Sequence, residues 1–151
     1  MSIWWSLHLR CEAASVPLAR RMLLGTMETA GIDPDISYDL SVALSEACAN
    51  AVEHAATTGT GPDEYRVTAS IDDDRCHIEV TDSGPGFPVV RGPRPVRTLH
   101  GHASYAESGR GLFLIEALMD HVQISNTPGN GAVVTFDKSL KPPTGTFAQA
   151  S

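Results

Sequence analysis

The spacing of hydrophobic and polar positions along the chain predicts three helices and five strands. Apolar residues recur every three to four positions in three segments, as on one buried helix face: 15–30, 33–56 and 111–119. Apolar and polar residues alternate in five segments, as in half-buried strands: 3–10, 65–71, 76–80, 121–125 and 131–136. This order predicts an α+β fold, a two-layer sandwich with the helices on one face of a mixed, largely antiparallel sheet.

Residues at the ends of these segments support the assignment. Ser15 is a candidate N-cap for the first helix, and Gly31 suits its end. Asp33 and Asp35 lie near the positive end of the second helix. Four residues of the first helix have the spacing of core positions: Leu18, Met22, Leu23 and Met27. The three consecutive aspartates at 72–74 lack the spacing of a calcium loop and predict a solvated hairpin turn.

The segment 83–108 shows neither a helical nor a strand period, and it holds four prolines. A connection of this length without structure of its own is usually functional or disordered. The length of 151 residues favours one domain with a hydrophobic core. We therefore expect a single domain over residues 1–140 and a flexible tail over 141–151.

The net charge of −7 is unevenly distributed. Residues 33–82 hold twelve of the eighteen acidic groups and two of the eleven basic ones. An acidic protein repels a phosphate backbone, so we expect no direct binding of nucleic acid. The local excess of basic residues suits an anionic ligand or an acidic partner, and it comprises Arg91, Arg94, Arg97 and Arg110.

Hydrophobic content and cysteine usage point to a cytoplasmic protein. Hydrophobic residues make up 42% of the chain, and no apolar run approaches the length of a membrane span. The first residues have no basic region ahead of an apolar one, so we expect no secretory signal. Three cysteines are too few and too scattered for a disulfide framework or a zinc site, which favours reduced thiols.

Three polar residues of the second helix carry candidate chemistry. Glu46, Asn50 and His54 are four residues apart, so their side chains lie on one stripe of the helix. A carboxylate and a carboxamide one turn apart suit a divalent cation, or a water that must be held and deprotonated. An ordinary solvent-facing helix surface is the alternative interpretation, and for His54 the two interpretations are equally good.

Two glycine-containing segments follow. Asp82 ends a predicted strand, and Gly84 and Gly86 after it allow either a tight turn or close approach of the backbone to a ligand. The second segment opens a helix, where unpaired amides and the helix dipole favour an anion: Ser108-Gly109-Arg110-Gly111-Leu112. Arg110 could add a charge-assisted contact. The segment lacks the lysine of a Walker A loop.

In order and spacing, the three segments resemble the N, G1 and G2 boxes of the GHKL ATPase superfamily. The similarity is greatest to its short single-domain members, the anti-sigma-factor serine/threonine kinases. It extends from the first strand to about Lys138. The resemblance implies a Bergerat-type ATP-binding fold in which residues 83–108 form the ATP lid.

The resemblance also implies ATP and Mg²⁺ as ligands. Asn50 would bind Mg²⁺, and Glu46 would activate the hydroxyl or water that attacks the terminal phosphate. Asp82 would accept a hydrogen bond from the adenine amino group. Thr135 matches a position that often supports the base, although a β-branched residue is also ordinary in a strand. His54 would line the phosphate side.

Two functions follow from the resemblance. The first is a kinase that phosphorylates a serine or threonine of an anti-anti-sigma (STAS-type) protein and sequesters a sigma factor. The second is a non-catalytic module whose affinity for a partner depends on ATP. Some kinase members have an arginine where this chain has Glu107, whereas the presence of Glu46 favours the enzyme. Either function is compatible with a homodimer.

Overall fold

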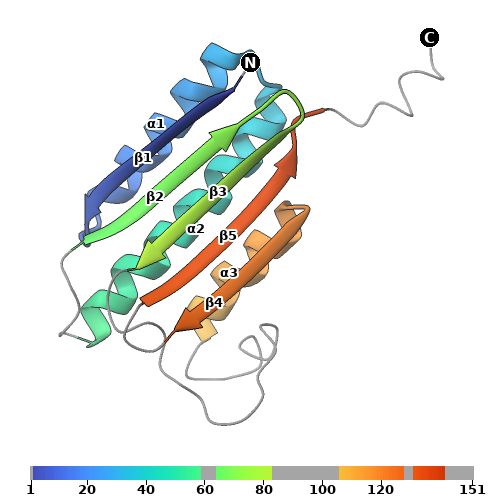
Figure 1. Cartoon of the computed structure of the whole chain (residues 1–151). Coiled ribbons are helices and arrows are strands. Elements are labelled where there is room, and N and C mark those ends of the chain that lie inside the picture. The colour runs from blue at the N-terminus through green and yellow to red at the C-terminus, as the bar shows by residue number, and fades with distance from the viewer. Residues whose placement is uncertain (1, 59–63, 83–105, 128–130, 142–151) are drawn as a thin grey trace.

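The computed structural model describes residues 2–58, 64–82, 106–127 and 131–141. It has three helices, α1 (Ser15–Ala30), α2 (Pro34–Thr58) and α3 (Ala106–Leu118). Its five strands are β1 (Ile3–Arg10), β2 (Glu64–Ile71), β3 (Arg75–Asp82), β4 (His121–Thr127) and β5 (Gly131–Ser139). The strands form one sheet in the order β1-β2-β3-β5-β4, and the helices cover one of its faces (Figure 1).

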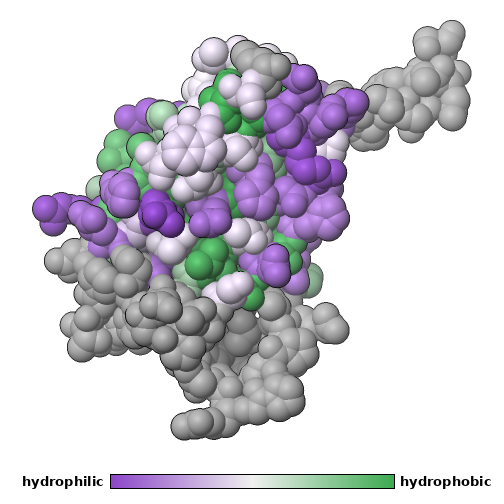
Figure 2. Space-filling model, in the orientation of Figure 1, coloured by the Kyte–Doolittle hydropathy of each residue, from purple (hydrophilic) through white to green (hydrophobic). Residues whose placement is uncertain are grey.

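The predicted α+β sandwich is confirmed. All four strand pairings are antiparallel, so the described sheet contains no parallel pair and is simpler than the mixed sheet that the sequence suggested. No helix of the described residues covers its second face, and Figure 2 shows mainly hydrophilic side chains there. This is the usual division of an antiparallel sheet into a buried and a solvated face.

The element bounds agree with the prediction to within a few residues. Gly31 adopts φ = 73° and ends α1, as expected for a glycine in the left-handed region. The larger difference is at α3, which begins at Ala106 and not at Gly111, so that residues 106–108, which the sequence assigned to the lid, are helical. The rest of the predicted lid and the predicted tail from residue 142 lie outside the described residues.

The core lies between the helices and the inner face of the sheet. The predicted inner face of α2 is buried from Ile36 to Ala51: Ile36, Leu40, Ala43, Leu44, Ala47 and Ala51. In α1, Leu23 and Met27 are fully buried as predicted. The prediction was wrong for Leu18 and Met22, which are 52% and 40% exposed. The sheet ends at β1, and Met22 lines an open groove between α1 and that edge strand.

Ser15 is buried and does not cap α1. The N-cap position is Ala14, which makes no side-chain capping bond. The Ser15 hydroxyl donates to the carbonyl of Glu12 at 2.8 Å and shares a 2.7 Å hydrogen bond with the Tyr65 hydroxyl. The serine therefore fixes the start of α1 to β2, a tertiary role that a local capping signal does not reveal.

The other polar predictions at helix and strand ends are confirmed. Asp33 accepts a 2.8 Å hydrogen bond from the backbone N–H of Asp35 at the start of α2. In the β2–β3 turn, Asp72 accepts hydrogen bonds from the backbone N–H groups of Asp74 and Arg75. No cluster of metal-ligating side chains occurs among the described residues.

The three cysteines are free thiols, as predicted. Burial raises the pKa of the Cys48 thiol to about 12, and burial raises that of Cys76 to about 12 as well. At neutral pH both are protonated, so neither is a reactive thiolate. In the part of the chain that the structure describes, no helix is long and apolar enough to cross a bilayer.

Lys138 connects three elements at the end of the sheet opposite Asp82, the last residue of β3. Its Nζ donates a 2.8 Å hydrogen bond to the carbonyl of Leu118, the last residue of α3. The same atom lies 3.9 Å from the carboxylate of Asp39 on α2. A cation at a helix C-terminus interacts favourably with the helix dipole, and Lys138 is largely buried. It therefore holds the end of α3 against both α2 and β5.

We expect Lys138→Met to lower the free energy of unfolding by about 1–2 kcal/mol, because it leaves the Leu118 carbonyl without its donor. Lys141→Met is the matched control. Lys141 pairs with Asp74 between two well-exposed side chains, so its loss should cost about 0.5 kcal/mol or less. Urea denaturation followed by circular dichroism measures both. Equal losses would show that Lys138 does not hold α3.

Candidate functional site

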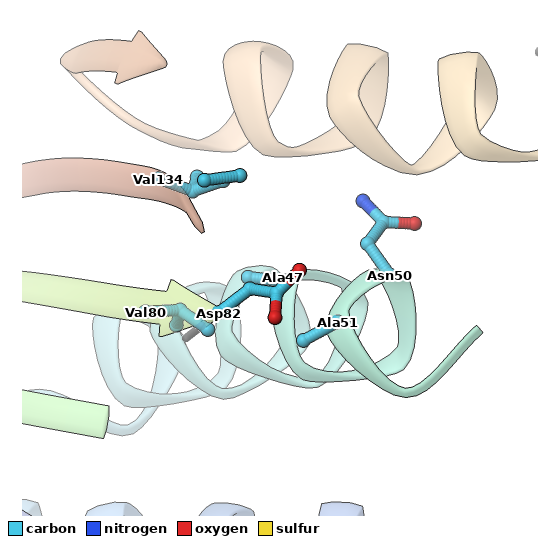
Figure 3. A pocket seen from close by; sticks show the side chains of 7 residues that line it. Ala47, Asn50, Ala51, Val80, Asp82 and Val134 are labelled. Atoms are coloured by element: carbon cyan, nitrogen blue, oxygen red, sulfur yellow. The ribbon is translucent and has the colours of Figure 1, made fainter. Parts of the chain in front are cut away.

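A pocket lies between α2 and the inner face of the sheet at the end of β3. Its walls come from three elements, as Figure 3 shows: Ala47, Asn50 and Ala51 from α2, Val80 and Asp82 from β3, and Ala132 and Val134 from β5. Five of these seven residues are alanine or valine. Asn50 and Asp82 are the two polar members, so the polar chemistry of the pocket depends on them.

Asp82 is the last residue of β3 and points to the helical side. Strand residues alternate between the two faces, and Asp82 shares its face with Val80 and Ile78. Only 6% of Asp82 is exposed. A carboxylate is an acceptor of hydrogen bonds, and apolar surroundings strengthen the bonds it accepts. Asp82 therefore suits a ligand that presents an N–H donor to the pocket.

Asn50 enters the pocket from α2, one helical turn beyond Glu46. Its Nδ2 atom is buried and has no hydrogen-bond partner among the described residues. A buried donor without a partner typically costs about 1–3 kcal/mol, so native structures rarely keep one without a reason. The unpaired amide indicates that this position contacts a group outside the described residues.

Glu46 and His54 flank Asn50 on the same helix. Glu46 is partly exposed and lies outside the residues that line the pocket. Its spacing keeps it on the stripe of Asn50, as the sequence predicted. His54 is in the next turn of α2, and its side chain is outside the described residues.

The two glycine-containing segments are only partly described. Gly84 and Gly86 lie outside the described residues. Ser108, Gly109, Arg110 and Gly111 lie in the first turns of α3, but nothing is described of their side chains. Leu112, which the sequence grouped with them, is 2% exposed and belongs to the hydrophobic core. The Leu112 side chain therefore anchors α3 in the core and does not face a ligand.

Thr135 is on the wrong face of the sheet for the predicted role. On β5, Ala132, Val134 and Phe136 are buried under the helices, so Thr135 points to the uncovered face. Its hydroxyl donates to the carbonyl of Gln123 at 3.3 Å. We therefore leave Thr135 out of the site. Ala132 and Val134 take its place as the β5 contribution to the pocket.

The pocket suits one kind of ligand part in particular. The chemistry of the lining, apolar walls with a single buried acceptor, suits the edge of a flat ring that carries an amino group, such as adenine, although the described residues enclose only about 10 Å³. Asn50 offers an amide to groups beyond the ring, and its oxygen is a ligand that Mg²⁺ accepts. The residues present thus fit a complex of adenine nucleotide and Mg²⁺, in which the nucleotide phosphates and water supply the other metal ligands.

Sequence comparisons agree with this geometry. The profile of the histidine kinase-like ATPase domain matches residues 9–138. The serine-protein kinase RsbW of Bacillus licheniformis is 35% identical over 130 residues, which cover 83% of this chain and 78% of that protein. RsbW of Bacillus subtilis strain 168 is 32% identical over 138 residues, which cover 83% of this chain and 86% of that protein.

Two solved structures share the fold. The structure of the RsbU and RsbW domains of Rv1364c from Mycobacterium tuberculosis matches with a TM-score of 0.64 and 23% identity over 91% of this chain, which spans 33% of that longer one. The SiaB–SiaC complex from Pseudomonas aeruginosa matches with a TM-score of 0.64 and 13% identity, covering 90% of this chain and 88% of that one. With the profile match over residues 9–138, these findings establish that the chain belongs to the histidine kinase-like ATPase domain family.

Proposed function

We propose that this protein is an ATP-dependent serine/threonine kinase of the anti-sigma type. It phosphorylates an anti-anti-sigma (STAS-type) protein and sequesters a sigma factor. The observation that carries the proposal is that Asp82 and Asn50 meet in one otherwise apolar pocket. It is supported by the 35% identity to a serine-protein kinase over 83% of the chain.

Asp82 recognises the base in this proposal. Its carboxylate accepts a hydrogen bond from the adenine amino group, while Val80, Val134 and Ala47 contact the faces of the ring. Only 6% of Asp82 is exposed, so a base without an amino group at this position forfeits a hydrogen bond that water does not readily replace. The pocket therefore selects an amino group at this position of the ring.

Asn50 holds the metal in this proposal. Mg²⁺ usually keeps several waters and takes only one or two protein ligands when it is bound to nucleotide phosphates. A single carboxamide oxygen is thus sufficient, which agrees with the absence of a metal-ligand cluster among the described residues. The bound nucleotide supplies the phosphoryl group, and Mg²⁺ offsets the negative charge of its phosphates.

Glu46 acts on the acceptor in this proposal. It is partly exposed, so a serine or threonine of a partner protein can reach it. The carboxylate orients the hydroxyl and accepts its proton as the oxygen attacks the terminal phosphorus. The bond between that phosphorus and the bridging oxygen breaks, and ADP leaves. The first turn of α3, which begins at Ala106, offers its unpaired amides to the phosphates, and Arg110 adds a positive charge.

The three free thiols support a reducing, cytoplasmic environment, in which ATP is also available.

A non-catalytic module that binds its partner in an ATP-dependent manner is the competing function. It would keep the same roles for Asp82 and Asn50, so only Glu46 separates the two functions. The experiments below therefore test nucleotide binding and phosphoryl transfer apart from each other.

Asp82→Asn should weaken ATP binding about tenfold to a hundredfold, because it places a donor where the adenine amino group needs an acceptor. The affinity for ADP should fall by the same factor, since the contact is to the base. Asp73→Asn, in the turn at the other end of β3, is the control and should bind normally. Titration calorimetry measures all three proteins. Unchanged affinity in Asp82→Asn would mean that the base binds elsewhere.

Asn50→Ala should abolish the strengthening of ATP binding by Mg²⁺ while it preserves binding in EDTA. Asn50→Asp keeps an oxygen ligand and should retain the Mg²⁺ effect. Because the buried Nδ2 has no partner among the described residues, Asn50→Ala should not lower the free energy of unfolding. An equal Mg²⁺ effect in wild type and Asn50→Ala would exclude Asn50 as the ligand.

Glu46→Gln should slow phosphoryl transfer to the partner protein roughly a hundredfold to ten-thousandfold, the usual contribution of a general base. It should bind ATP about as well as wild type, because the base pocket is unchanged. Asp35→Asn, which changes a carboxylate at the opposite end of α2, should transfer at the normal rate. Radiolabelled ATP and an anti-anti-sigma partner provide the assay. A wild-type protein that binds both but transfers no phosphate is a module and not a kinase.

A further inference from the structure

A chain of buried hydroxyl and thiol groups joins α1, β2 and α2 next to the candidate site. Tyr65, the second residue of β2, lies at its centre and is 1% exposed. The phenol oxygen is 2.7 Å from the Ser15 hydroxyl at the start of α1. The same phenol is hydrogen-bonded to the thiol of Cys48 on α2. All three residues are buried, so water does not readily replace these hydrogen bonds.

The direction of each hydrogen bond follows from the number of protons available. The Ser15 hydroxyl donates its proton to the carbonyl of Glu12 at 2.8 Å, so towards Tyr65 it can only accept. The Tyr65 hydroxyl therefore donates to Ser15, and its oxygen accepts the S–H of Cys48. Burial raises the pKa of Tyr65 above its usual range, so the phenol keeps its proton at neutral pH. Removing the phenol oxygen would deprive both of its neighbours of a partner.

Tyr65 is also a neighbour of the pocket. In the β2–β3 register it lies directly opposite Asp82, and both side chains are buried on the helical side of the sheet. Directly opposed side chains of an antiparallel pair are in contact distance. The Tyr65 ring therefore stands beside Asp82, although it is not among the residues that line the pocket. Its hydroxyl extends beyond this contact to α2.

The part of α2 that carries Asn50 is packed through small side chains. Beyond Leu44, the buried residues described in this helix are Ala47, Cys48 and Ala51. Each helical residue turns the side-chain direction by about 100°, so Asn50 points about 60° to one side of Ala47 and Cys48 about 100° to the other. The hydrogen bond of Cys48 on one flank thus limits the rotation of α2 that would displace Asn50 on the other flank.

A small rotation is sufficient to disturb the site. Side chains lie about 5 Å from the helix axis, so a turn of about 10° moves them by about 1 Å. A displacement of about 1 Å can reduce activity about a hundredfold when it affects groups that must be held in a fixed geometry. Glu46 is on the same stripe as Asn50 and would move with it.

We propose that Tyr65 is a positioning residue of the candidate site: through Cys48 it fixes the rotation of α2 and thereby the placement of Asn50. This inference rests on the proposed function, in which Asn50 binds Mg²⁺. The Tyr65 ring packs beside Asp82 with or without the hydroxyl group. Loss of the hydroxyl should therefore weaken the contribution of the metal and preserve the recognition of the base.

The experiment measures the Mg²⁺ effect, the ratio of ATP affinity in Mg²⁺ to that in EDTA, by titration calorimetry. Tyr65→Phe should lower this ratio about tenfold and leave the affinity in EDTA nearly unchanged. Thr26→Val is the matched control, because it removes the acceptor of a 3.0 Å hydrogen bond from Trp5 Nε1 that joins the sheet to α1 and not to α2. Both variants should lower the midpoint of urea unfolding, but Thr26→Val should keep the full Mg²⁺ effect.

Two variants of Cys48 separate positioning from stability. Cys48→Ser keeps a donor towards Tyr65 and should keep the Mg²⁺ effect, whereas Cys48→Val removes the donor and should lower the effect as Tyr65→Phe does. A full Mg²⁺ effect in Tyr65→Phe overturns this inference and leaves the proposed function intact. An equal loss in Thr26→Val or Cys48→Ser also overturns it, since the loss would then follow stability and not the hydrogen bond. A wild type without any Mg²⁺ effect overturns the role of Asn50 and this inference together.

Discussion

The packing of α2 against the end of β3 is the interaction on which the candidate site depends. Ala47 and Ala51 are buried at this contact and form part of the pocket wall. Asn50 lies between them in sequence, and each helical residue advances the direction of the side chain by about 100°. A helix turned by one residue would remove Asn50 from the pocket. The small alanines thus set both the room in the pocket and the placement of its amide.

Much of the fold followed from periodicity because one layer of helices covers one face of the sheet. Each strand then has a buried and a solvated side, and each helix has one inner stripe, which are the two patterns that a sequence displays most clearly. The burial of Ile36, Leu40 and Leu44 in α2 was predictable for this reason. So was the position of Asp82, since a strand that ends at an aspartate before two glycines leaves that carboxylate at the sheet terminus.

The sequence predictions were wrong where two roles of a residue share the same local pattern and tertiary contacts decide between them. Ser15 looks like an N-cap, but the hydroxyl of Tyr65, fifty residues away, determines its role. Leu18 and Met22 have core spacing, yet both are exposed on α1, which packs at the edge of the sheet. Thr135 had a usable signal, because Val134 and Phe136 on either side predict that the threonine faces outward. The family resemblance nevertheless placed Thr135 in the site. The strand register pairs Thr135 with Glu79 and Val134 with Val80, so Thr135 faces outward as the alternation predicts.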